Sequence, residues 1–165
     1  MSESSNYLTN GRFSHSMSDD SGDFKGDFKI LAQLSSIIKG DPFLGHLGVE
    51  VVEIDFGYAK LKMPESGIVL RHGGIVNGGA ISALIDAAGG TATATVNRGK
   101  NQVTIELKIN FLEPVRMGEM TCVAKVVRGG RNIVVSDMEL FDCNGKLCAK
   151  GIGTWMILYE EKFKV

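Results

Sequence analysis

One segment near the middle of the chain limits the folds that this sequence can adopt. Between Ile75 and Val96 there is no Lys, Arg or Glu, and Asp86 is the single charged residue. A helix of this length without a charged face has no side suited to water, so the rest of the fold has to bury it on all sides. We therefore expect a long central helix surrounded by the remaining elements.

A membrane span is the other structure that an uncharged helix can form. Pairs of glycines at 78–79 and 89–90 interrupt this segment, its residues are mostly small, and Asp86 lies at its middle. Such a segment is only weakly hydrophobic, and a carboxylate in a bilayer is costly. We therefore expect no membrane span.

Strand patterns fill most of the remaining chain. Apolar residues at helical spacing predict one further helix over residues 28–39, which Asp41-Pro42 ends. Strands are expected where apolar and polar residues alternate or where turn residues separate apolar runs. They cover residues 49–55, 58–63, 103–111, 119–128, 133–141 and 147–158.

The order of these elements indicates an α+β fold. A hairpin, one long helix and four antiparallel strands pack most simply when a sheet of about five to six strands wraps around the helix. Residues 1–26 are rich in Ser, Asp, Gly and Asn without an apolar period, which predicts a flexible tail. Residues 27–165 then form a single domain.

Composition and charge exclude several classes of protein. The formal net charge of -1 gives no reason to expect nucleic acid as a partner. Cys122, Cys143 and Cys148 are odd in number and match no metal motif, so we expect reduced thiols and no bound metal. The start of the chain lacks a secretory pattern, and a cytoplasmic location follows by default.

Several motifs resemble one family of enzymes. The run RHGGIVNGGA at residues 71–80 with LID at 84–86, and TIELKINFLEP at 104–114, resemble hotdog-fold thioesterases of the phenylacetate-pathway type. The GGR turn at 129–131 and GIGT at 151–154 are similar too. The resemblance implies a hotdog fold, with a long central helix wrapped by an antiparallel sheet. It also implies a hydrolase that cleaves acyl-CoA or aryl-CoA thioesters without a cofactor.

Asp86 is the residue on which the predicted chemistry depends. A buried carboxylate is costly unless it is paired or its pKa is raised, and a general base is one reason to keep it. A purely structural hydrogen bond is the alternative reason. The resemblance favours the base, and it implies that Thr104 of a neighbouring subunit holds the attacking water.

The start of the central helix is the second predicted part of the site. Free N–H groups and the helix dipole suit a carbonyl oxygen that gains negative charge. The resemblance assigns the backbone N–H of Gly79 to this task, with Asn77 where many relatives have His. An N-cap by Asn77, with Gly78 and Gly79 needed for packing, is the structural alternative.

The remaining candidates concern substrate binding and assembly. The predicted substrate-binding residues are Arg71, His72, Gly78, Arg128 and Arg131, with Lys100 as a further candidate for the CoA phosphates. The resemblance implies a homodimer or homotetramer with sites at the dimer interface. A dehydratase and a non-catalytic acyl-CoA-binding module remain alternatives. No His lies on the helix, as a dehydratase would need, and the N-terminal tail of about 40 residues is too short and too acidic for the DNA-binding domain expected beside a binding module.

Overall fold

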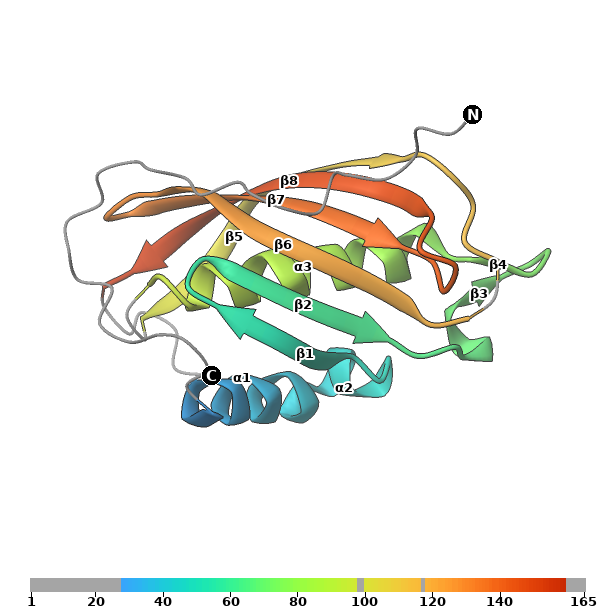
Figure 1. Ribbon diagram of the computed structural model, residues 1–165, viewed down its shortest axis with the longest axis horizontal. Coiled ribbons are helices and arrows are strands. Elements are labelled where there is room, and N and C mark those ends of the chain that lie inside the picture. Colours follow the sequence, from blue (N-terminus) through green and yellow to red (C-terminus); the bar gives the residue numbers. More distant parts are fainter. Residues whose placement is uncertain (1–27, 98–99, 117, 160–165) are drawn as a thin grey trace, which may run out of the picture.

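A curved antiparallel sheet and the helix that it surrounds make up most of the structure. The computed structural model describes residues 28–97, 100–116 and 118–159. Helix α3 lies along one face of a sheet in the order β1-β2-β6-β7-β8-β5 (Figure 1). The helices are α1 (Phe28–Gly40), α2 (Pro42–His46) and α3 (Gly78–Ala94), with a 3-10 turn η1 (Gly67–Val69). The strands are β1 (Glu50–Asp55), β2 (Tyr58–Met63), β3 (Leu70–Arg71), β4 (Ile75–Val76), β5 (Asn101–Phe111), β6 (Met120–Gly129), β7 (Ile133–Phe141) and β8 (Leu147–Leu158).

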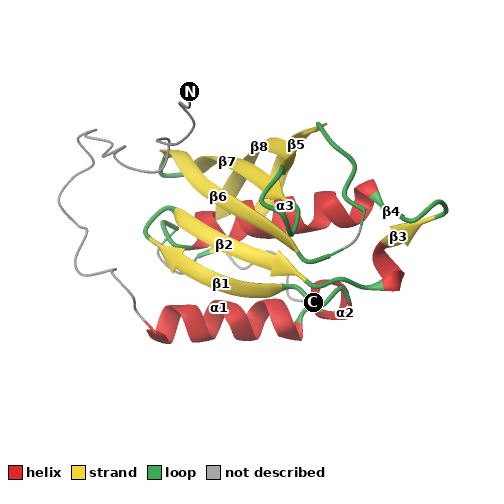
Figure 2. Cartoon of the chain, turned by 45° about the vertical axis from the view of Figure 1, so that its right-hand side comes forward, coloured by secondary structure: helices red, strands yellow, loops and turns green. Residues whose placement is uncertain are grey.

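This architecture confirms the predicted fold. Strands β2, β7 and β8 have the predicted bounds, and the other long strands and α1 differ from their predicted bounds by one or two residues. The sheet has six strands, as expected for a hotdog fold, and α1 packs beside β1 (Figure 2). The predicted tail, residues 1–26, lies outside the described residues.

Four short elements, α2, η1, β3 and β4, were not predicted. Asp41 ends α1 but also caps α2, because its Oδ1 accepts hydrogen bonds from the backbone N–H groups of Phe43 and Leu44. β3 and β4 form a two-stranded hairpin before α3, so Ile75 and Val76 are strand residues and not part of the helix. Elements of two to five residues are too short to show a repeat in the sequence.

Helix α3 is buried along most of its surface but not on all sides, which corrects the prediction. Ten of its 17 residues are buried, among them Leu84, Ile85 and Ala88. One stripe is only partly covered or exposed, and it includes Gly79, Ser82, Ala83, Asp86 and Gly90. This spacing of three to four residues defines one face of the helix. The single chain therefore leaves the face that carries Asp86 accessible.

A β-bulge in β5 reverses the predicted orientation of Thr104. Apolar and polar residues alternate over residues 103–111, which predicts that Thr104 lies on the polar side of a regular strand. The pairing with β8, however, shifts register between Thr104 and Glu106. Thr104 pairs with Trp155, which is buried on the α3 side of the sheet, and Ile105 is 52% exposed. A bulge adds one residue to a strand, so side chains on either side of it change faces.

The single tryptophan of the chain fixes how closely α3 approaches the sheet. Trp155 is 2% exposed and its ring lies against Gly89 of α3 and Gly153 of β8. A Cβ atom added at Gly89 would lie 2.2 Å from Cη2 of Trp155, and one added at Gly153 would lie 2.5 Å from the same atom. Only glycine fits at these two contact points.

Replacing Gly89 by Ala should therefore destabilise the protein. Overpacking of a dense core costs about 1–3 kcal/mol, which exceeds the helix-propensity gain of about 1 kcal/mol from Gly to Ala. The free energy of unfolding can be measured in urea by circular dichroism. The cost of Gly89→Ala should shrink in a Trp155→Phe background, because the ring atoms that clash are absent there. Equal costs in both backgrounds would refute this packing contact.

Candidate active site

Asp86 lies half-buried on the accessible stripe of α3. Burial raises the pKa of its carboxyl group above the usual range, and the hydrogen bond from Thr104 lowers the pKa by a smaller amount. Among the described residues no Lys, Arg or His forms an ion pair with it. A carboxylate with an elevated pKa and no compensating cation is well suited to take a proton.

Thr104 is the partner of Asp86. Its hydroxyl group donates a hydrogen bond to Oδ1 of Asp86, with an oxygen–oxygen distance of 2.9 Å. The contact lies within one chain, whereas the resemblance implied that Thr104 approaches the acid from a neighbouring subunit. The bulge in β5 explains the difference, because it turns Thr104 toward the helix of its own chain. The second oxygen of Asp86 has no hydrogen bond in the described chain, so it can bind a water.

The start of α3 combines a helix cap with an open donor. Asn77 is the N-cap, and its Oδ1 accepts a hydrogen bond from the N–H of Gly79 at 2.8 Å. The predicted carbonyl-polarising group, the Gly79 N–H, is therefore already bonded. The N–H of Gly78, the first residue of the helix, has no acceptor among the described residues. The alternative reading of Asn77 as a cap is thus correct.

The helix start and Asp86 of one chain are too far apart to act on one carbonyl group. Gly78 and Asp86 are eight residues apart, which corresponds to about 12 Å along a helix. The free N–H groups of a first turn point out of the N-terminal end of the helix, so a carbonyl group that accepts from Gly78 lies beyond that end and still further from Asp86. A water that bridges a base and the carbonyl carbon spans only about 6 Å, with two contacts of about 3 Å each. A site that uses both the Gly78 N–H and Asp86 would therefore draw them from two different chains.

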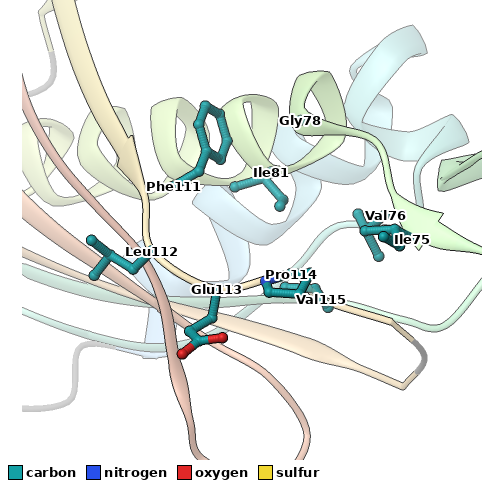
Figure 3. Close-up of a pocket in the computed structure, with 9 residues that line it drawn as sticks. All are labelled: Ile75, Val76, Gly78, Ile81, Phe111, Leu112, Glu113, Pro114 and Val115. Carbon is teal, nitrogen blue, oxygen red and sulfur yellow. The ribbon is translucent and has the colours of Figure 1, made fainter.

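Arg71 and His72 lie at the tip of the hairpin that precedes α3, and both are exposed. Arg71 pairs with Ile75, and residues directly opposite in an antiparallel pair share one face of the hairpin. Ile75 lines a pocket at the start of α3 (Figure 3), so Arg71 lies on the pocket side of the hairpin. His72 lies in the turn of this hairpin, and among the described residues it forms no hydrogen bond or ion pair with Asp86.

The predicted phosphate-binding cations gather at the other end of the molecule. Arg128, Arg131 and Lys100 are exposed, and Arg131 lies in the turn between β6 and β7. Lys100 Nζ lies 4.0 Å from the ring centroid of Tyr159, and the Arg131 guanidinium carbon lies 5.9 Å from it. The Tyr159 hydroxyl donates a hydrogen bond to the backbone carbonyl of Arg131. Two of the three candidates thus share one aromatic partner.

Sequence reasoning missed Gln102, which fixes β5 against α3. Its Nε2 donates to the backbone carbonyl of Gly90 at 2.6 Å, one turn after Asp86 on the helix. Its Oε1 accepts from Asn97 Nδ2 at 2.7 Å. Because Gln102 and Thr104 lie on the same strand, this contact holds Thr104 at its distance from Asp86. A polar residue two positions before Thr104 was the signal in the sequence.

The two buried cysteines are poor candidates for a nucleophile. Cys122 and Cys148 are buried, and burial raises the pKa of both thiols, so neither forms a thiolate readily. Within the described ranges no group of three or more His, Cys, Asp or Glu side chains could hold a metal ion. The same ranges contain no helix long and apolar enough to cross a membrane.

Comparison with known proteins identifies the family. The model of the thioesterase superfamily matches residues 73–149, which include Asp86 and Thr104. A curated protein of Saccharolobus solfataricus, named "Putative esterase SSO1253", is 35% identical over 130 residues that cover 79% of this chain and 87% of the relative. The chain belongs to the thioesterase superfamily. A second protein of that organism, "Putative esterase SSO2140", is 44% identical to this thioesterase-superfamily chain. The match covers 73% of this chain and 86% of the relative.

Solved structures agree with this family and with the hotdog fold. The thioesterase HI1161 from Haemophilus influenzae superposes with a TM-score of 0.73 at 26% identity, covering 81% of this chain and 94% of that protein. The PaaI protein of the E. coli phenylacetic acid degradation operon gives a TM-score of 0.73 at 24% identity, covering 79% and 94%. The predicted resemblance is therefore confirmed. Membership of the thioesterase superfamily and relatives that are named putative esterases together support hydrolase activity for this chain.

Replacing Thr104 by Val in this thioesterase-superfamily protein should shift its pH–rate profile. Val keeps the shape of Thr but removes the hydrogen bond that lowers the pKa of Asp86, so that pKa rises further. With Asp86 as the predicted general base, which acts only when deprotonated, the acid limb of thioester hydrolysis should therefore move to higher pH. Thr104→Ser keeps the hydroxyl group and should leave the limb in place. Identical acid limbs for Val and Ser would refute the coupling.

Proposed function

We propose that this protein hydrolyses the thioester bond of an acyl-CoA or aryl-CoA to a free acid and CoA. The observation that carries the proposal is the contact between Asp86 and Thr104 on the accessible stripe of α3. It combines a carboxylate of raised pKa with a hydroxyl group that orients it, in a chain of the thioesterase superfamily. No cofactor is required, because CoA is part of the substrate.

Asp86 activates the attacking water in this proposal. The carboxylate takes one proton while the water oxygen bonds to the thioester carbonyl carbon, which gives a tetrahedral oxyanion. The carbon–sulfur bond then breaks, CoA leaves as the thiolate, and the proton held by Asp86 returns to the sulfur. The products are the carboxylic acid and the CoA thiol, and Asp86 is again ionised.

The first turn of α3 stabilises the oxyanion. Gly78 N–H is the open donor at this turn, and Gly79 N–H, the group expected from the resemblance, becomes available only when the side chain of Asn77 turns away. The positive end of the helix dipole adds to the attraction for developing negative charge. Gly78 is therefore the principal donor, and Asn77 holds the turn in shape.

Two copies of the chain build each site. The separation of about 12 Å between Gly78 and Asp86 requires that the helix start of one copy meets Asp86 of another. Two features favour such a dimer. The accessible stripe of α3 lacks charged residues other than Asp86, and β5 is an edge strand of 11 residues. A homodimer, or a homotetramer built from it, follows.

In this proposal, three exposed cations bind the nucleotide end of CoA. Arg128, Arg131 and Lys100 are exposed, and the phosphates of CoA attract such groups. Contacts there raise the affinity for substrate without contributing to bond cleavage. A cytoplasmic location, where acyl-CoA is made and used, completes the proposal.

Replacing Asp86 by Asn should abolish most activity without unfolding the protein. Asn has the same size and its Oδ1 can still accept the hydrogen bond from Thr104, but it cannot take a proton. Thiol release from acyl-CoA should fall by about 10²–10⁴-fold, the usual contribution of a general base. Circular dichroism and light scattering should show an unchanged fold and assembly. Near wild-type turnover in a folded variant would refute the mechanism and favour an acyl-CoA-binding module.

Replacing Gly78 by Pro tests the helix donor. Proline is well tolerated at the first position of a helix, and the extended backbone of Asn77 (φ -64°, ψ 134°) suits a residue before proline. The substitution removes the N–H group, and turnover should fall by about 10²–10³-fold. Gly78→Ala adds a comparable Cβ but keeps the N–H, and it should retain most activity. Equal losses in both variants would exclude Gly78 as the donor.

Co-expression of the two inactive variants tests the shared site. In a dimer of one Asp86→Asn chain and one Gly78→Pro chain, one of the two sites combines an intact Asp86 with an intact helix start. Random pairing should therefore restore about one quarter of wild-type activity. A site contained within one chain would show no recovery.

A further inference from the structure

A pocket opens at the start of α3, beside the proposed oxyanion donor. Its volume is about 320 Å³, and Figure 3 shows the side chains that line it. β4 contributes Ile75 and Val76, α3 contributes Gly78 and Ile81, and residues 111–115 form the opposite wall. Gly78 belongs both to this lining and to the helix turn that faces the thioester carbonyl in the proposed mechanism. An acyl group attached to that carbonyl would extend from Gly78 into the pocket.

Backbone hydrogen bonds hold the walls of this pocket in place. The N–H of Val76 donates to the carbonyl of Val115 at 2.8 Å, which joins the β4 wall to the opposite wall. The N–H groups of Leu112 and Glu113 both donate to the carbonyl of Cys148, at 2.8 and 3.1 Å. These contacts fix the segment that follows β5 to the sheet. The pocket is therefore formed before a ligand arrives.

The pocket carries almost no charge. Its lining is aliphatic or aromatic except for Glu113, and the carboxylate of Glu113 points away from Ile81 and Val76 (Figure 3). That carboxylate pairs with Lys146 Nζ at 3.0 Å. A charged group placed among these lining side chains would lose its hydration without gaining a partner there. Arg71 lies on the pocket side of the hairpin, but it is exposed and does not line the pocket. The lining therefore selects an uncharged, apolar group.

Phe111 links the pocket to the reaction centre. The ring lies against the first turns of α3 (Figure 3), and a Cβ atom added at Gly78 would lie 3.5 Å from Cζ and 3.6 Å from Cε1 of Phe111. Phe111 is 55% exposed, so part of its ring remains open to a ligand. Phe111 thus borders both the Gly78 donor and the space beyond it.

We propose that Phe111 sets the size of the acyl group that this protein accepts, and that the group is uncharged and apolar. A cavity of about 150 Å³ holds one benzene molecule, so 320 Å³ accommodates one aryl ring with a short linker or an aliphatic chain of medium length. Removing the Phe111 ring extends the pocket and admits longer chains. This inference rests on the proposed thioesterase function, since it assigns the acyl part of that substrate.

Replacing Phe111 by Ala should move the preference for chain length. We would measure kcat/KM by thiol release for straight-chain acyl-CoAs from butanoyl to hexadecanoyl. The kcat/KM for dodecanoyl-CoA should rise by about tenfold, and the kcat/KM for butanoyl-CoA should fall by about tenfold. The reason is that each misplaced methylene group in an apolar pocket changes kcat/KM by about 10-fold or more. Phe111→Leu, which is less disruptive, should shift the profile in the same direction by a smaller amount.

Matched measurements keep the test specific. Ile152→Ala truncates a partly exposed apolar residue on β8 outside the pocket and should leave the chain-length profile unchanged. Wild type should prefer hexanoyl-CoA over adipoyl-CoA, its counterpart with a terminal carboxylate, by about 100-fold or more. Superimposable profiles for wild type and both Phe111 variants, or equal rates for hexanoyl and adipoyl, would overturn the inference.

The failure of this inference can be separated from failure of the proposed function. If wild type releases thiol from none of these substrates, the thioesterase proposal fails. Binding of non-hydrolysable S-(2-oxoalkyl)-CoA thioethers, measured by calorimetry, then tests the pocket alone. Phe111→Ala should bind the twelve-carbon analogue more tightly than wild type does, and unchanged affinity would refute the role of Phe111 whatever the catalytic result.

Discussion

The close approach of α3 to the sheet is the contact on which the rest of the structure depends. Trp155 fills the space between them, and glycines at 89 and 153 leave room for its ring. Because the helix has no charged side, this tight packing can cover most of its surface. The face that remains accessible carries Asp86, so the same contact that builds the core also determines which helix residues stay accessible.

Much of the fold could be predicted because its signals are periodic or chemically distinctive. The uncharged segment predicted α3, and the alternating residues and turn glycines predicted the long strands. The orientation of Thr104 could not be predicted in this way, since a one-residue bulge leaves the sequence pattern intact while it moves side chains to the other face. β3 and β4 have two residues each and carry no period at all.

The candidate site shows the same division. Asp86 stands out in the sequence because it is the single charged residue of a buried segment. Which N–H group of the helix start remains open depends on where the side chain of Asn77 points, and an Asn-Gly-Gly sequence does not determine that. The contact of Gln102 with the Gly90 carbonyl likewise depends on how β5 lies against α3, which no period in the sequence determines.

The edge position of β5 affects the tendency of a newly synthesised chain to aggregate. A strand of 11 residues whose outer backbone groups lack a partner in the sheet is a template for the addition of another strand, and Ile105 adds an exposed apolar side chain to it. In the proposed dimer, a lone copy would face a choice between pairing with its partner and aggregation. Pairing that covers this edge would then protect the chain from aggregation as well as complete the proposed site.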